Sequence, residues 1–231
     1  YSEAFDNAYW TKSGASVVSG FTSPDGTANA FKLVEDTSAG NHKINRTYTF
    51  TAVEHSASIR IKPNGRTRVA LWIDGAGKGT KFDLSNGTIV SETNSVGKIK
   101  KLSNGWFDIS TTIDGTNGTF ITLYVQDDLG NSSYIGDGVS GIYIYGAQLE
   151  EGSYPTSYIK SNSGTTTTRV AETANGAGDA TFNSSEGVLM AEISALADLD
   201  TTRRITLNQG VSGVNLISIQ YRNNGELRIY N

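Results

Sequence analysis

Hydrophobic and polar residues alternate with a period of two over most of the first two thirds of the chain. This alternation is typical of β-strands that bury one face in a core and turn the other toward solvent. It is seen in residues 28–35, 42–51, 56–63, 67–74, 106–113, 119–127 and 141–146. Residues 189–200 are the one candidate for a helix, and the overlapping run GVLMAEISAL favours a strand there. The pattern therefore predicts an all-β protein.

Asn-Gly pairs separate many of these segments, at positions 64–65, 86–87, 104–105 and 117–118. Asn and Gly tolerate the positive φ angles that tight hairpins require. Many short strands joined by such turns predict a jelly-roll β-sandwich. Its core is expected to hold the residues of one parity, which are Ile59, Ile61, Val69, Leu71, Ile73, Ile121, Leu123, Val125, Ile142 and Ile144.

The composition changes near residue 159, where a stretch rich in Ser, Thr and Gly begins. We interpret residues 1–158 as the jelly-roll domain, 159–172 as a linker and 173–231 as a smaller, incomplete β unit. A unit of about sixty residues is short for an independent sandwich. The chain starts without Met and ends on a strand-like run, so the sequence predicts either a piece of a longer polypeptide or a processed product.

The chain is acidic, with a net charge of −4 over 231 residues. An acidic chain is repelled by a phosphate backbone, so no nucleic-acid partner is expected. The absence of Cys from the sequence excludes disulfides, thiolate nucleophiles and Cys-type zinc sites. No apolar run approaches the roughly 18 residues of a membrane span, so no membrane insertion is expected.

Sequence motifs for catalysis are few. The run GAGKGT at 75–80 occurs in phosphate-binding loops, but a hairpin pattern follows it where such a loop needs a helix. His42 and His55 are the only histidines, and neither has the spacing of a nucleophilic or metal site, so both are predicted to be exposed or half-buried strand residues. The acidic, Gly-rich loop 127–138 suits either a hard cation or solvent. The sequence predicts a protein that is not an enzyme.

Four stretches carry a resemblance to a known family: YSEAFDNAYWTKSGASVV at the start, then SPDGTANAFKLVEDTSAGNHKI, LSNGWFDISTTI in the middle, and GDGVSGIYIYGAQLEEGSYPTSYI near residue 150. Residues 1 to about 172 resemble the jelly-roll modules of bacteriophage tail and other virion proteins, which are related to the carbohydrate-binding modules of xylanases and glucanases. The chain departs from that pattern at Tyr145, where members often have Trp, and at Asp108, where they often have a basic residue. The part after residue 172 is similar to the beginning of a laminin-G or concanavalin-like domain.

The resemblance implies a non-catalytic carbohydrate-binding or adhesion module in a virion tail or another extracellular protein. The partners that it implies are a polysaccharide or cell-surface glycan, further copies of the chain, or other virion proteins. Two alternatives stay open: a structural virion domain that binds no sugar, and an accessory module of a polysaccharide-degrading enzyme. A glycan array distinguishes a sugar-binding module from a structural virion domain that binds no sugar.

In the middle strands, the residues that alternate with the predicted core residues point away from the core. These outward-facing residues are the candidates for sugar binding. Flat aromatic rings fit the C–H faces of sugars, and polar side chains bond sugar hydroxyls. The candidates are Trp72, Arg60, Arg68, Tyr124, Gln126, Tyr143 and Tyr145. A contact between domains or subunits would use the same aromatic residues, and that interpretation also stays open.

A structural calcium ion is implied by the resemblance alone. Related carbohydrate-binding modules hold Ca²⁺ where the N-terminal segment meets the last strand, and the ion takes several carboxylate and carbonyl oxygens. The candidate ligands in this sequence are Glu3, Asp6, Asp25 and Gln148.

Overall fold

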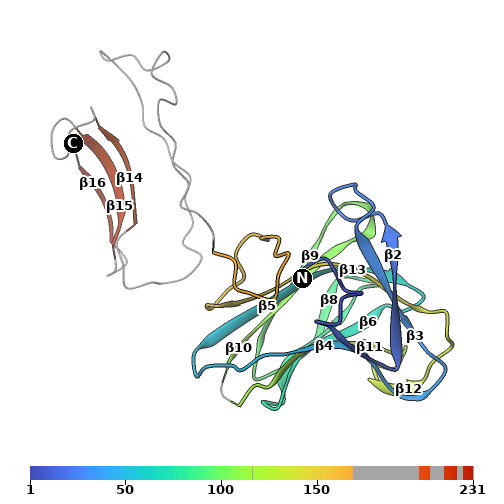
Figure 1. Cartoon of the computed structure of the whole chain (residues 1–231). Helices are drawn as coiled ribbons and strands as arrows, with labels where there is room; N and C mark the ends of the chain where they lie inside the picture. The colour runs from blue at the N-terminus through green and yellow to red at the C-terminus, as the bar shows by residue number, and fades with distance from the viewer. Residues whose placement is uncertain (116, 169–202, 209–215, 223–225, 231) are drawn as a thin grey trace. The chain divides into compact units, whose positions relative to one another are not determined.

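The computed structural model describes residues 1–115, 117–168, 203–208, 216–222 and 226–230 (Figure 1). The chain divides into two compact units, Tyr1–Arg169 and Val170–Asn231. The described residues form strands and one short 3₁₀ helix, Ser103–Gly105, so the predicted all-β class is confirmed. The strand expected at GVLMAEISAL lies outside the described residues. No helix among the described residues is long and apolar enough to cross a membrane.

The first unit is a sandwich of two antiparallel sheets, which we call the first and the second sheet (Figure 1). The first sheet has the order β1 (Thr11–Ser13), β4 (Ala39–Thr47), β11 (Phe120–Gln126), β6 (Arg68–Asp74), β7 (Lys78–Asp83), β8 (Thr88–Thr93), with β12 (Ser133–Ile135) paired to β4. The second sheet has the order β2 (Ala15–Phe21), β3 (Ala30–Glu35), β13 (Gly141–Glu151), β5 (Glu54–Asn64), β10 (Phe107–Asp114), β9 (Val96–Lys101).

The core between the two sheets contains the residues that the alternation predicted. Nine of the ten predicted side chains are buried, and Ile121 is half-buried against the same core. Each buried aliphatic side chain stabilises the fold by about 1.5–3 kcal/mol relative to an exposed one. The period-2 pattern therefore assigned the inward face of β5, β6, β11 and β13 correctly.

Strand β13 contains the bulge that ends the alternation of residues 141–146. Its register with β5 shifts between Tyr145 and Gln148, and Gly146 there has a φ of +62°. A side chain at this position would be strained, and its Cβ would lie 2.7 Å from Nη1 of Arg60. The strand continues beyond the bulge to Glu151, and Ala147, after the bulge, is half-buried.

A second apolar cluster lies outside the main core. It is built on Trp106 and Tyr145, which are 1% and 7% exposed, together with Ala30. Phe21, Leu102, Tyr143 and Tyr158 pack around it. The cluster joins the N-terminal strands, the segment before β10 and the residues after β13.

The described part of the second unit is a three-stranded antiparallel sheet, β14 (Arg203–Asn208), β15 (Leu216–Tyr221) and β16 (Leu227–Tyr230). Its three strands lie side by side at the red end of the colour scale in Figure 1. Ile205, Ile219 and Ile229 are in register across the three strands, and Ile229 is 71% exposed.

Candidate functional site

Two aromatic side chains are diagonal neighbours on the outer face of the first sheet. Thr122 of β11 lies directly opposite Trp72 of β6, and Tyr124 is two residues further along β11 on the same face. Both Trp72 and Tyr124 are half-buried. Diagonal neighbours in a sheet are within reach of each other when the side chains are aromatic. Both residues lie on the face that points away from the core, and we call them the aromatic patch.

The indole of Trp72 lies over a glycine of the next strand. Gly79 of β7 is opposite Trp72 in the register, and a Cβ built on Gly79 would be 2.6 Å from Cε3 of the indole. It would also be 2.5 Å from the carbonyl oxygen of Leu71. The last glycine of the GAGKGT motif is thus needed for the packing of a tryptophan. Lys78 of that motif donates to Asp114 Oδ2 at 2.7 Å, and a strand follows it instead of a helix, so the motif is not a phosphate-binding loop.

A polar cluster borders the aromatic patch. Asp74 Oδ2 accepts a hydrogen bond from Thr122 Oγ1 at 2.7 Å, and both carboxylate oxygens lie 3.1 Å from the hydroxyl of Tyr124. The ammonium of Lys43 lies 3.8 Å from Asp74 Oδ2 and 5.2 Å from the centre of the Tyr124 ring. Burial, with a further contribution from Asp74, raises the pKa of Tyr124 to about 12. The phenol therefore stays protonated and fixed beside a carboxylate and an ammonium.

Arg68 and Gln126 lie opposite each other on the same face, but only Arg68 is accessible. The side chain of Arg68 is 31% exposed, and its Nη2 pairs with Asp83 Oδ2 at 3.4 Å. The prediction that Gln126 is exposed is wrong, because Gln126 is 1% exposed. Its amide donates to the carbonyl of Gly130 at 2.8 Å and to Ser132 Oγ at 3.0 Å, so it holds the loop that follows β11.

The remaining three candidates lie on the second sheet, so the seven residues do not form one patch. Tyr143 packs against Phe21 with ring centres 4.8 Å apart, and the Arg60 guanidinium lies 4.6 Å over the ring of Tyr158. The prediction that Tyr145 is exposed is also wrong, since only 7% of its surface is exposed. Segments distant in the sequence cover the outer face of the second sheet at these positions.

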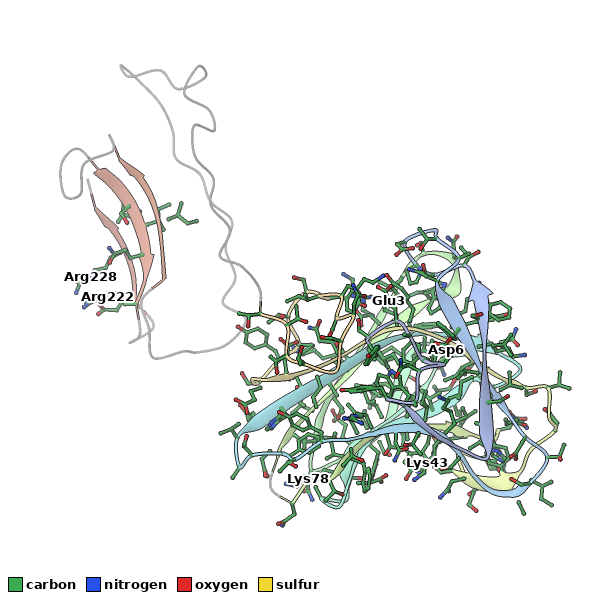
Figure 2. All side chains as sticks on the ribbon, viewed as in Figure 1. Glu3, Asp6, Lys43, Lys78, Arg222 and Arg228 are labelled. Atoms are coloured by element: carbon green, nitrogen blue, oxygen red, sulfur yellow. The ribbon has the colours of Figure 1, made fainter. Side chains whose placement is uncertain are left out.

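The proposed calcium ligands are divided between two places. Glu3 Oε1 and Asp25 Oδ2 approach the hydroxyl of Tyr145, at 3.1 Å and 2.8 Å. Gln148 lies elsewhere: its Oε1 accepts from the backbone N–H of Ile159, and its Nε2 donates to Glu150. Gln148 is therefore unsuited to the ion. In Figure 2 Glu3 and Asp6 are labelled on the N-terminal segment.

One buried oxygen that the sequence reasoning missed lies near Glu3. Glu3, Asp6 and Asn29 line a cavity of about 400 Å³, and Oδ1 of Asn29 is buried there without a hydrogen-bond partner. Its Nδ2 donates to Glu3 Oε2 at 3.4 Å, and Lys160 also contacts that oxygen at 2.6 Å. Within the described ranges, no three acidic or histidine side chains come together as a metal-binding group. Both oxygens of Glu3 are already engaged, Oε1 by the hydroxyls of Tyr145 and Tyr158 and Oε2 by Lys160 and Asn29 Nδ2, so the residues present do not fit a calcium ion well.

Both histidines are structural, and the prediction that they are exposed or half-buried is wrong. His42 and His55 are fully buried. His42 Nδ1 and Nε2 contact the carbonyl oxygens of Gly14 and Tyr134, and His55 Nδ1 contacts that of Val53. Each ring therefore anchors backbone segments inside the sandwich.

A scan of the sequence against protein-family models gives no match, and a search among curated proteins gives none. Similar solved structures include TmCBM61 in complex with β-1,4-galactotriose, at 15% identity and a TM-score of 0.39, covering 65% of this chain and 95% of that one. A second is the enzymatically active domain of bacteriophage CBA120 tailspike protein 4, at 16% identity and a TM-score of 0.39, covering 65% of this chain and 20% of that one.

A third is the CBM22-1 and GH10 portion of Clostridium thermocellum endo-1,4-β-D-xylanase 10B with xylohexaose, at 13% identity and a TM-score of 0.36. The match covers 62% of this chain and 26% of that one.

Proposed function

We propose that the first unit is a non-catalytic carbohydrate-binding module that holds a polysaccharide on the outer face of its first sheet. The observation that carries this proposal is the diagonal pair Trp72 and Tyr124 on adjacent strands. A solvent-side indole and phenol serve no purpose in the core. Flat rings in this position complement the C–H faces of a sugar ring.

The charged groups around the pair supply the polar half of such a site. Lys43 and Arg68 can donate hydrogen bonds to sugar hydroxyls, and Asp74 can accept them. Their side chains are 20%, 31% and 24% exposed, so a ligand can reach them while their positions stay fixed by neighbours. Fixed polar groups beside an aromatic surface are what an oriented sugar needs.

The sequence resemblance to the jelly-roll modules of phage tail proteins supports an extracellular location for this sugar binding. A module that holds a cell-surface glycan without cleaving it would serve adhesion, in a virion tail or another extracellular protein. The second sheet supports a competing function. Its outer aromatics pack within the chain, so this side of the module would act as structure that spaces or carries other domains.

Glycan binding by the full chain tests the proposal directly. We expect binding on an array at millimolar sugar, and a loss of at least about tenfold in affinity, or ~1.4 kcal/mol, in Trp72→Ala and in Tyr124→Ala. Tyr154→Ala, a half-buried tyrosine beyond the end of β13, is the matched control and should bind normally. Circular dichroism should show all three variants folded. No binding by the wild-type chain would favour the structural function.

A further inference from the structure

Strand β10 lies between two strands that carry cations on the outer face of the second sheet. The register places Asp108 of β10 opposite Arg60 of β5 on one side and opposite Lys100 of β9 on the other. Asp108 alternates with the core residue Ile109, and residues directly opposite each other share a face, so all three side chains point away from the core. One carboxylate therefore stands between two cations in this row.

Two further lysines extend the cations along the two flanking strands. Lys62 comes two residues after Arg60 on β5, and Lys98 comes two residues before Lys100 on β9, so both lie on the same outer face. Residues two apart on a strand are separated by about 7 Å, and β5 and β9 lie two strand spacings, or about 10 Å, apart. We call Arg60, Lys62, Lys98 and Lys100 the basic patch. It flanks β10 on both sides.

The three lysines of the basic patch have no salt-bridge partner. Lys98 and Lys100 are exposed, and Lys62 is half-buried. Among the residues that the structure describes, none forms a salt bridge with Lys62, Lys98 or Lys100. Arg60 is held in place by Asp108, whose Oδ2 lies 3.9 Å from its Nη2. The patch therefore presents ammonium groups that can donate hydrogen bonds to an incoming anion.

The charge of the basic patch opposes that of the rest of the chain. Its four cations and the single carboxylate of Asp108 give a net charge of +3, whereas the whole chain carries −4, so the remaining residues carry −7. Burial raises the pKa of Asp108, although Arg60 and Lys100 act in the opposite direction. Exposed charges within a Debye length of about 8 Å act together on a ligand at physiological ionic strength. The patch is therefore a local site for anions on an acidic protein.

We propose that the basic patch binds a polysaccharide made of uronic acid residues, which lies along β10 between the two rows of cations. Carboxylates of the polymer accept charge-assisted hydrogen bonds from Lys62, Lys98 and Lys100. The inference rests on the proposed carbohydrate-binding function and adds a second site, selective for charge, on the sheet opposite to the aromatic patch.

The wide spacing of the cations favours a polymer with one charge per sugar residue. The cations are about 7 Å apart along a strand and about 10 Å apart across β10, whereas the phosphates of one DNA strand follow each other at about 3.4 Å. A nucleic acid would therefore place several charges against each cation, and more of them beside Asp108 and the negative remainder of the chain. A uronic acid polymer meets less of this repulsion.

Two polymers that differ only in charge test the selectivity on the full chain. Isothermal titration would compare polygalacturonic acid with its methyl ester at about pH 7, where the acid is ionised. We expect the acid to bind at least about tenfold more tightly than the ester in about 50 mM NaCl. This advantage should shrink in about 300 mM NaCl, because added ions screen exposed charges. Equal binding of the two polymers would overturn the inference.

Single lysine variants locate the site. Lys98→Gln and Lys100→Gln should each weaken the binding of polygalacturonic acid by about threefold, since one exposed charge pair contributes modestly. Lys101→Gln is the matched control, because Lys101 is also exposed but lies on the opposite parity of β9. It removes the same charge and should change the affinity by less than about twofold in about 150 mM NaCl. Equal losses in Lys100→Gln and Lys101→Gln would overturn the inference, since the total charge of the chain would then set the affinity.

Asp108→Asn gives the opposite expectation. It removes the one carboxylate between the two rows of cations, so the binding of polygalacturonic acid should tighten by about twofold to threefold. Circular dichroism and thermal unfolding check that every variant is folded. Unchanged or weaker binding by a folded Asp108→Asn variant would overturn the inference, because Asp108 would then not lie beside the bound polymer. If Asp108→Asn fails to fold, the lysine variants decide.

Other polyanions test the assignment to uronic acids. Dextran sulfate and oligothymidylate would be titrated under the same conditions as polygalacturonic acid. We expect both to bind more weakly than polygalacturonic acid. Tighter binding of dextran sulfate would assign the patch to a sulfated glycan, and tighter binding of oligothymidylate would assign it to a nucleic acid. Either result would overturn the inference.

The two proposals fail in different ways. Binding of polygalacturonic acid that depends on Lys98 and Lys100, and not on Trp72, supports the basic patch, and a lack of binding to neutral glycans in the same chain would remove the aromatic patch alone. Binding of neutral glycans that depends on Trp72, without any preference for the acid over its ester, supports the aromatic patch and removes the basic patch.

Discussion

The carboxylate of Glu35 and the guanidinium of Arg66 form a two-point ion pair in which Nε donates to Oε2 at 2.9 Å and Nη2 to Oε1 at 2.6 Å. The same carboxylate accepts from the Tyr134 hydroxyl at 2.6 Å and from the backbone N–H of Asp137 at 2.9 Å. Glu35 ends β3 and is 1% exposed. One buried carboxylate therefore fastens the loop around residues 134–140 to the end of β5.

Replacing Glu35 by Gln should destabilise the first unit by about 3 kcal/mol, because it leaves the Arg66 charge without its partner at a largely buried site. Urea unfolding followed by tryptophan fluorescence measures this. The double variant Glu35→Gln/Arg66→Met should cost less than the sum of the two single changes. Additive costs would show that the pair does not act as a unit.

Stability should fall with acid. Burial alone would raise the pKa of Glu35, but the hydrogen bonds from Arg66 and Tyr134 outweigh it and the pKa is lowered. Hydrogen bonds from hydroxyl and backbone donors also lower the pKa values of Asp137 and Asp25. The largest contribution comes from the Ser140 hydroxyl for Asp137 and from the Ser23 hydroxyl for Asp25. Carboxyls with a lowered folded pKa contribute stability that is complete above their unfolded pKa of roughly 4 and is lost as the pH falls through the folded pKa.

The urea midpoint should therefore be nearly constant from about pH 7 to 5 and decrease below about pH 4. Glu35→Gln should show a shallower decrease than wild type, since one of the titrating groups is gone. A midpoint that rises on acidification would contradict the assigned directions.

Gly79→Ala should displace Trp72 and weaken any sugar binding on the first sheet. The added Cβ would overlap the Leu71 carbonyl and the indole, and overpacking of this kind costs about 1–3 kcal/mol. Gly40→Ala is the matched control, because Gly40 has a φ of +149° against +155° at Gly79 but no heavy atom within 4 Å of its Cβ position. Urea unfolding and glycan titration compare the two variants. Equal effects would mean that position 79 requires glycine because of its backbone conformation and not because of the indole.

Tyr145 should behave as a core residue. Tyr145→Ala removes a ring from the cluster with Trp106 and should cost about 3 kcal/mol or more, by the scale of buried aromatic truncations. Tyr145→Phe keeps the ring but removes the hydroxyl beside Glu3 and Asp25, and should cost about 1 kcal/mol. Thermal unfolding checks both values. A Tyr145→Ala variant as stable as the wild type would contradict the burial of Tyr145.

Calcium binding stays a prediction of the resemblance alone, and Glu3 is the ligand whose replacement tests it. Extracellular calcium modules bind at about 0.1–1 mM, so ~10 mM CaCl₂ should stabilise the fold by roughly 1.4–2.7 kcal/mol. This corresponds to a rise of several degrees in Tm after chelator treatment, and Glu3→Gln should abolish it. Gln148→Ala should not affect the rise, because Gln148 is engaged with Ile159. An unchanged Tm in wild type would end the proposal.

The sequence by itself determined the strands and their inward faces. Alternation is a local property: in β5, β6, β11 and β13 it places every second side chain on one side, and apolar residues on that side must be buried. Trp72 and Tyr124 followed from the same parity, and Lys43 could have been found in the same way from the segment 42–51. Asn-Gly pairs located turns for an equally local reason, with Asn104 and Asn117 at positive φ.

Only the tertiary structure decided what covers the outward faces. The alternation places Tyr145 and Gln126 outside the main core, but residues from other parts of the sequence bury them. Trp106 and Tyr158 cover Tyr145, and the loop after β11 covers Gln126. The division of the seven candidates between two sheets depends on strand pairing across long separations, such as β13 with β5. A cavity of about 630 Å³ between the sheets likewise combines residues from 1–10, β4, β13 and 159–167. Contacts between segments so far apart depend on the packing of the whole sandwich, and no local pattern in the chain encodes them.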